Sequence, residues 1–153
     1  MIPINKVIFN GKEKKYLAEC IDTGWISSVG HFVKKFEEGY SSFIGTKYGV
    51  AVSSGTAAIE TALFALGVKK GDEVIMPAFT IISCAIACIR LGAKPVLVDI
   101  EPQNWIMDVS KIESKITSKT KVIMPVHIYG HPVDMDEILK LAKNIPGLLC
   151  SFH

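Results

Sequence analysis

The chain has 153 residues, of which 49% are hydrophobic and 21% are charged, and its formal net charge is +2. A chain of this length and composition can bury a hydrophobic core, so we expect a folded globular protein. Its lysines and acidic residues are interspersed and form no basic stripe, which argues against a nucleic-acid partner.

The four cysteines and the N-terminus favour a reduced, cytoplasmic protein. Cysteines occur at positions 20, 84, 88 and 150, without the paired spacing of a disulfide framework. The N-terminus has no basic region followed by an apolar stretch, and the longest near-apolar run, Ile81–Ile89, is about half of what a membrane span needs. We therefore expect no membrane association.

The first part of the chain is predicted to be helical. Apolar residues at helical spacing predict one helix around Tyr16–Ile21, ending at Gly24, and a second around Phe32–Tyr40. Residues 1–45 are accordingly predicted to be an N-terminal helical segment.

After Gly45 the pattern changes to short β-rich runs that alternate with helical windows. Strands are predicted at Tyr48–Val52, Glu73–Met76, Pro95–Val98, Lys121–Val126 and Leu148–Cys150. Helices are predicted at Ala57–Leu66, Ile81–Leu91, Val109–Ile116 and Met135–Lys143. This alternation predicts the α/β class for residues 46–153, with a mainly parallel sheet and helices on both of its faces.

The run Val50–Ala58 has the pattern of a phosphate site. An apolar segment leads into Ser-Ser-Gly-Thr, and a helical window follows at once. The unpaired N–H groups at a helix N-terminus, together with the helix dipole, can hold a phosphate without a lysine or arginine. The same residues are also typical of an ordinary helix cap, so the turn alone leaves both interpretations open.

Three loops are expected to meet at one edge of the sheet. In open parallel sheets, ligands bind where strands end and loops lead into helices. The loops are Ser53–Thr56, Pro77–Thr80 and His127–His131.

Two residue pairs have spacings that could suit a metal, but we predict no metal site. Cys84 and Cys88 lie four residues apart in an apolar run, which favours core positions over metal ligation. His127 and His131 have no carboxylate or further histidine at a matching spacing.

Several runs together resemble the DegT/DnrJ/EryC1/StrS family of sugar aminotransferases, and within it the perosamine-synthase-like enzymes. The resemblance covers nearly the whole chain, in order. It is carried by Gly24–Ser28, Ser54–Ala58, Gly71–Thr80, Gly92–Asp99, Ile116–Lys121 and Val126–Asp136.

The resemblance implies a partial large domain of a type I pyridoxal-phosphate (PLP) aminotransferase. It further implies a homodimer whose two subunits share each active site. Glutamate would donate the amino group, and the acceptor would be a keto sugar linked to a nucleoside diphosphate. Such an enzyme would act in polysaccharide biosynthesis.

Carried over by position, the resemblance assigns cofactor and substrate residues. Gly55, Thr56 and Ala57 would hold the cofactor phosphate. Ile81 stands where the family carries an aromatic ring stacked on the pyridine, so weaker stacking is expected, with Phe79 as a less favoured substitute. Trp25 and Ser27 would lie near substrate; Trp25 could equally anchor the N-terminal helices.

The resemblance also implies an acidic residue that pairs with the pyridine nitrogen and, much further along, a lysine that forms a Schiff base. The sequence has Leu148–His153 where the acidic run would begin. We therefore predict no catalytic residue in this chain and no transamination by the chain alone. The alternatives are pairing with a separate C-terminal fragment, a non-catalytic remnant or binding module that associates with a full-length homologue, and a disrupted reading frame.

Overall fold

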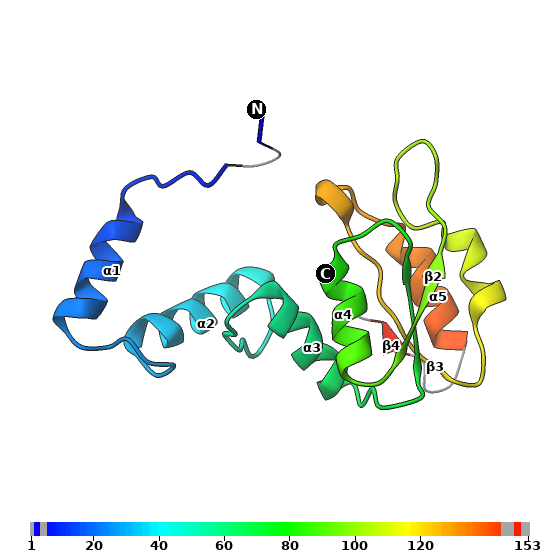
Figure 1. Ribbon diagram of the computed structural model, residues 1–153, viewed down its shortest axis with the longest axis horizontal. Coiled ribbons are helices and arrows are strands. Elements are labelled where there is room, and N and C mark those ends of the chain that lie inside the picture. Colours follow the sequence, from blue (N-terminus) through cyan, green and yellow to red (C-terminus); the bar gives the residue numbers. More distant parts are fainter. Residues whose placement is uncertain (1, 4–5, 145–148, 151–153) are drawn as a thin grey trace. The chain divides into compact units, whose positions relative to one another are not determined.

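The computed structural model describes residues 2–3, 6–144 and 149–150 (Figure 1). The chain divides into two compact units, Met1–Ala51 and Val52–His153. Each unit is described below by itself.

The first unit contains two helices, as the sequence predicts. Helix α1 spans Lys12–Asp22 and helix α2 spans His31–Ile44, where Gly45 ends the helix with a positive φ of 80°. A glycine adopts that left-handed conformation without steric cost. Ser41 is the one residue of the two helices classed as buried. The apolar side chains of this unit therefore form no closed core of their own.

The predicted strand Tyr48–Val52 is wrong. No described strand pairs with these residues, whose backbone is irregular. The Ala51 N–H donates instead to the Glu37 carboxylate at 2.8 Å. A Cβ at Gly49 would lie 2.7 Å from the Glu37 carbonyl oxygen, so the segment lies directly against α2. This contact satisfies a backbone donor that a sheet would otherwise have paired.

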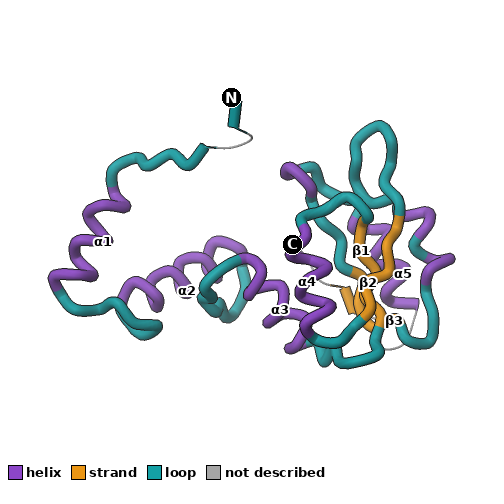
Figure 2. Tube along the Cα trace, in the orientation of Figure 1, coloured by secondary structure: helices purple, strands orange, loops and turns teal. Residues whose placement is uncertain are grey.

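The second unit is built on a parallel sheet, which confirms the predicted α/β class. Figure 2 shows the sheet in orange and the helices in purple. Its strands follow the order β2-β1-β3-β4, and every pairing is parallel. The strands are β1 (Glu73–Pro77), β2 (Lys94–Val98), β3 (Thr120–Ile123) and β4 (Leu149–Cys150). Leu148 and residues 151–153, where the acidic run was expected to begin, lie outside the described residues, as does the Cys150 side chain.

Helices cover both faces of this sheet. They are α3 (Gly55–Ala65), α4 (Ile82–Arg90) and α5 (Met135–Asn144). Figure 1 shows α4 and α5 on opposite sides of the strands. The helix expected at Val109–Ile116 is wrong in type, because two short 3-10 turns, η1 (Val109–Lys111) and η2 (Glu113–Lys115), occupy it. The Asp108 carboxylate accepts from both the N–H and the hydroxyl of Ser110, a local pattern that competes with a regular helix.

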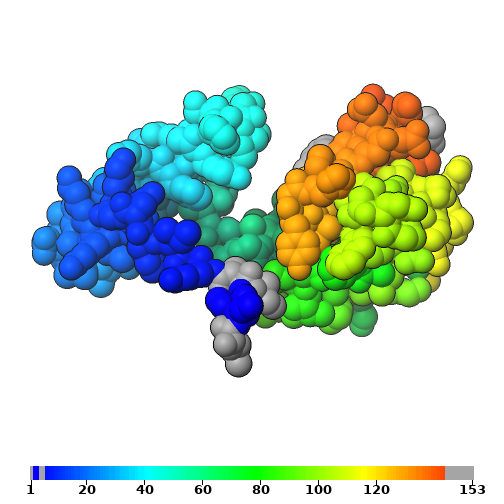
Figure 3. Space-filling model, turned by 90° about the horizontal axis from the view of Figure 1, so that it is seen from above, coloured from blue at the N-terminus to red at the C-terminus, as the bar shows by residue number. Residues whose placement is uncertain are grey.

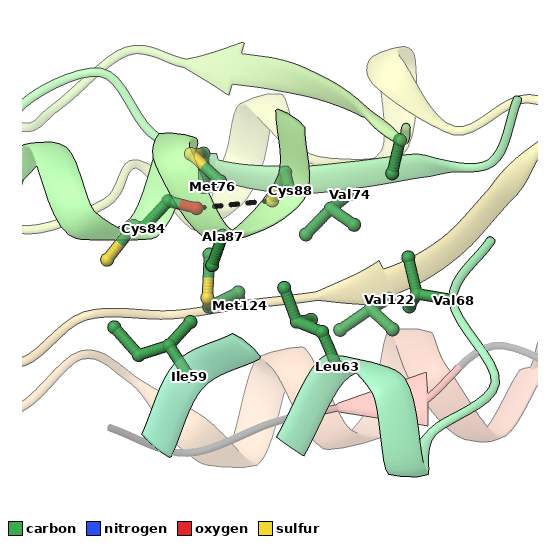
Figure 4. Packing of buried hydrophobic residues seen from close by; sticks show 11 residues of the cluster. Ile59, Leu63, Val68, Val74, Met76, Cys84, Ala87, Cys88, Val122 and Met124 are labelled. Atoms are coloured by element: carbon green, nitrogen blue, oxygen red, sulfur yellow. Dashed lines mark hydrogen bonds between the residues drawn. The ribbon is translucent and has the colours of Figure 1, made fainter. Parts of the chain in front are cut away.

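The core has two layers, one on each sheet face. Along β1, Val74 and Met76 pack with α3 and α4, whereas Ile75 packs on the α5 side. Figure 4 shows the first layer, in which Leu63 of α3 and Ala87 of α4 face the side chains of β1 and β3. Burial on both faces explains why β1 is apolar throughout.

The Glu73 carboxylate links the starts of β1 and β2 to the turn that precedes β3. Glu73 begins β1, and its side chain accepts a 2.6 Å hydrogen bond from the Thr117 hydroxyl and a 3.3 Å ion pair from Lys94 of β2. The Thr117 bond, followed by Lys94, lowers the pKa of the Glu73 carboxyl below its ordinary 4.5. This arrangement fastens the edge of the sheet opposite the candidate site.

Candidate functional site

The N-terminus of α3 presents two free backbone donors. Ser54 caps the helix, and its hydroxyl accepts the Ala57 N–H at 3.2 Å. Among the hydrogen bonds of the described residues, none uses the N–H of Gly55 or Thr56. These two groups therefore point out of a helix whose dipole places partial positive charge at the same end. The turn is thus a serine cap that leaves two backbone donors of the first helical turn without a partner among the described residues.

Gly55 keeps the space before this terminus open. A Cβ at Gly55 would meet no atom within 4 Å, and its φ is not in the left-handed range. Among the described residues, no close contact and no unusual backbone angle requires a glycine at this position. A side chain at this position would instead occupy the open space beside the first turn of α3.

A side-chain hydrogen bond joins the start of α3 to the start of α4. The Thr56 hydroxyl donates to the Ser83 hydroxyl at 2.8 Å. Ile81 is the N-cap residue of α4, and its side chain is 60% exposed. The predicted phosphate residues and the predicted ring-stacking residue therefore occupy neighbouring helix starts, at the edge where β1 ends.

Aromatic side chains from three loops gather at the same edge. Phe79 follows β1, Trp105 follows β2 and Tyr129 follows β3. The Phe79 ring meets Trp105 edge-on with centroids 5.5 Å apart, and its centroid lies 6.5 Å from that of Tyr129. The expected meeting of the loops at Pro77–Thr80 and His127–His131 is confirmed by this contact. The Phe79 ring therefore packs with the rings of Trp105 and Tyr129.

Trp105 and Tyr129 were not identified from the sequence as site residues. The signal existed, since Trp105 follows the predicted strand Pro95–Val98 and the rule on strand ends applies to that loop too. Tyr129 lay within a predicted loop but carried no assigned role.

Trp25 and Ser27 belong to the first unit, in the loop between α1 and α2. A largely apolar pocket of about 310 Å³ includes both of them, along with Leu17 and Phe32. The Ser27 hydroxyl donates to the Val29 carbonyl at 3.2 Å. Trp25 is 52% exposed, so one part of its ring lines the pocket and another faces solvent.

The two cysteines of α4 are core residues, as predicted. Cys84 and Cys88 are buried, and the Cys88 thiol donates to the Cys84 carbonyl at 3.2 Å (Figure 4). Burial raises the pKa of the Cys88 thiol to about 11. His127 has a structural role, because its Nδ1 accepts the Val133 N–H at 3.1 Å. No set of three metal-ligating side chains occurs among the described residues.

In the part of the chain that the structure describes, no helix has the length and apolar character needed to cross a membrane.

Comparisons with known proteins agree with this geometry. The chain is 48% identical over 143 residues to GDP-perosamine synthase from Escherichia coli O157:H7, covering 94% of this chain and 39% of that protein. It is 40% identical over 145 residues to a 3-oxo-glucose-6-phosphate:glutamate aminotransferase from Bacillus subtilis, covering 93% of this chain and 33% of that protein. The chain thus spans between a third and two fifths of the length of these curated relatives.

A solved structure shows the same arrangement. A sugar aminotransferase from Streptococcus pneumoniae, solved in PMP and PLP forms, matches with a TM-score of 0.87 and 35% identity over 94% of this chain and 36% of that one. The matched family is described as the DegT/DnrJ/EryC1/StrS aminotransferase family, and the match covers residues 8–148. Together with the parallel sheet and the capped α3 terminus, this match shows that the chain belongs to the DegT/DnrJ/EryC1/StrS aminotransferase family.

Proposed function

We propose that this chain forms part of a PLP-dependent sugar-nucleotide aminotransferase, in which the first turn of α3 binds the cofactor phosphate. One observation carries the proposal: the Gly55 and Thr56 amides have no partner among the described residues, the space beside Gly55 is open, and Thr56 is bonded to Ser83 at the start of α4. The donor set fits a phosphate, since it combines two N–H groups with the positive end of a helix.

Each residue has a distinct task in this proposal. The Gly55 and Thr56 amides donate to the phosphate, and the Ser54 cap holds Ala57 and the first turn in place. Ile81 covers one face of the cofactor ring with an aliphatic side chain. When bound, the cofactor withdraws electrons from the substrate carbon and carries the amino group. The chain's own residues fix where that chemistry takes place.

The substrate class follows from the relatives. We propose that glutamate donates the amino group and that the acceptor is a nucleotide-linked keto sugar, because one relative is named for glutamate and another for a GDP-linked sugar. Trp25 and Ser27 are the residues we propose for substrate contact. A cytoplasmic location remains the prediction made from the sequence.

A second copy of the chain is the partner we propose for the first unit. Its helices leave large apolar side chains exposed, including Phe36 at 59% and Phe43 at 86%. Such faces are typical of protein–protein interfaces. Sedimentation should therefore show dimers, or a complex with a C-terminal fragment when one is supplied; a monomer under both conditions would contradict this part of the proposal.

The same surfaces favour a second candidate, a non-catalytic module that associates with a full-length homologue. Mixing the chain with such a homologue should then yield mixed dimers. If mixed dimers form but the chain binds no cofactor, this candidate replaces the first.

Calorimetric titration with pyridoxamine phosphate tests the phosphate site. Gly55→Asp adds a negative charge where the phosphate would lie, yet an acid in the first turn suits the helix dipole, so the fold should persist. Two unit charges 4 Å apart repel by about 1 kcal/mol even in water, so a doubly charged phosphate is repelled by about 2 kcal/mol and affinity should fall about thirtyfold. Thr61→Asp adds the same charge further along α3 and should leave affinity unchanged. Equal affinity in the two variants would contradict the proposal.

A further inference from the structure

A pocket of about 360 Å³ lies between the loops that follow β2 and β3. Its walls are Gln103, Asn104, Trp105, Ile128, Tyr129 and His131. Figure 3 shows the surface of these two loops, yellow-green near residue 105 and orange near residue 130, side by side. Its volume falls in the range of small-molecule sites. Nothing in the proposed cofactor site uses these residues.

The loop after β2 is fixed so that Trp105 faces outward. The Asn104 amide donates to the Glu101 carboxylate at 2.5 Å and its oxygen accepts the Ile106 N–H at 3.1 Å. The Trp105 N–H donates to the Glu101 carbonyl at 2.9 Å. The indole is 55% exposed on this fixed loop.

The loop after β3 is fixed by a histidine. The His127 imidazole accepts the Val133 N–H at 3.1 Å, and the His127 carbonyl accepts the Gly130 N–H at 3.0 Å. Tyr129 lies between these contacts and is 83% exposed. Phe79 touches both aromatic rings and so limits their movement.

Both exposed aromatic residues have a strained backbone. Trp105 has a φ of 64° and Tyr129 a φ of 51°, and they are the described non-glycine residues with positive φ. Bulky residues rarely adopt this conformation, and such strain concentrates at functional sites. Both residues in this conformation carry a large aromatic ring that lines the pocket.

The pocket combines aromatic walls with free polar groups. The side chains of Gln103 and His131 make no hydrogen bond among the described residues, so an amide and an imidazole remain available. The planar rings of nucleobases stack on aromatic side chains, and side-chain amides form hydrogen bonds with the donors and acceptors at the edge of a base. Among the described residues that line the pocket there is no carboxylate to repel an attached phosphate.

We infer that this pocket binds the nucleobase of a nucleotide-linked substrate, with Trp105 and Tyr129 as stacking rings and Gln103 as the group that contacts the base edge. The inference rests on the proposed function, which supplies a nucleotide-linked substrate. It adds a location for the base, at the sheet edge that carries the α3 terminus.

Indole N–H resonances provide the test. The chain has two tryptophans, Trp25 and Trp105, and Trp25→Phe identifies which signal belongs to Trp105. Guanosine, or uridine as a smaller base, should shift the Trp105 signal saturably, whereas ribose 5-phosphate should not. Tyr129→Asn removes the ring while keeping a residue that tolerates positive φ, and should weaken guanosine binding about tenfold. Gln103→Ala, at an exposed position, should weaken it as well. Tyr48→Asn, at an exposed tyrosine of the first unit, should not.

Three results would overturn the inference: a shift of the Trp25 signal in place of Trp105, an equal response to ribose 5-phosphate, or wild-type affinity in Tyr129→Asn and Gln103→Ala. Guanosine carries no phosphate, so Gly55→Asp should not change its binding. Loss of pyridoxamine phosphate binding with guanosine binding intact would therefore count against the cofactor proposal alone.

Discussion

Thr56 and Ser83 join the first turns of α3 and α4 through hydroxyl groups 2.8 Å apart. The two residues lie 27 positions apart in sequence and come from helices separated by β1. Their bond fixes the α3 terminus at the edge where β1 ends. The proposed cofactor site depends on this connection, because free amides bind a phosphate well only when their direction is fixed.

Removing this bond should weaken both the fold and the site. Ser83→Ala leaves the Thr56 hydroxyl without its partner and should cost about 1 kcal/mol of stability. Affinity for pyridoxamine phosphate should also fall severalfold, because the first turn of α3 becomes less fixed. Ser114→Ala serves as the control. It removes a hydroxyl that donates to the Lys111 carbonyl, away from α3 and α4, so it should leave the affinity for pyridoxamine phosphate unchanged. Unchanged affinity in Ser83→Ala would contradict this account.

Adjacent residues of α3 should respond oppositely to truncation. Leu63 is fully buried between α3 and the sheet, so Leu63→Ala should lower the free energy of unfolding by about 2–5 kcal/mol. Phe64 is 71% exposed, so Phe64→Ala should change it by about 0.5 kcal/mol or less. Urea unfolding measures both. A larger effect at Phe64 would mean that the outer face of α3 is covered in solution.

Acid should remove the contribution of Glu73 to stability. Its pKa is lowered in the folded state by the Thr117 hydrogen bond and by Lys94, so the carboxylate stabilises the fold above its unfolded pKa and loses this effect as pH falls through the folded value. Glu73→Gln should lower the Tm at neutral pH, and its Tm should converge with that of the wild type as the pH falls through the lowered pKa of the Glu73 carboxyl. Glu113→Gln, at an exposed glutamate of η2, should show no such convergence.

The cysteines should differ in reactivity. Cys88 is buried and its thiol pKa is raised to about 11, so little thiolate is present at neutral pH. Peptide mapping after iodoacetamide treatment should show modification of the partly exposed Cys20, with Cys84 and Cys88 protected until urea unfolds the chain. Early modification of Cys88 would contradict the packing of α4 on the sheet.

The sequence predicted the helices and strands in which the spacing of apolar residues matches the positions that the structure buries. Val74–Met76 is apolar without interruption because β1 is buried on both faces, and α3 was predicted, although it begins at Gly55, directly after its Ser54 cap and two residues before the predicted start at Ala57. The predictions failed where a hydrogen bond from one side chain to the backbone determines the local backbone conformation. Glu37 takes the N–H of Ala51, which the strand prediction had assigned to a sheet, and Asp108 turns the expected helix into 3-10 turns.

The candidate site was predictable in part. The Ser54-Gly55-Thr56 turn could be identified because local residues specify a capped helix. Trp105 and Tyr129 could not be paired from the sequence, since their proximity depends on β2 and β3 lying on either side of β1. That strand order is a property of the whole sheet.

Amide resonances of Gly55 and Thr56 test the central claim most directly. Pyridoxamine phosphate and inorganic phosphate should both shift these two N–H signals, and pyridoxamine, which lacks the phosphate, should not. If pyridoxamine moves them equally, or if the phosphate compounds shift other residues and leave these two unchanged, the start of α3 is not the phosphate site.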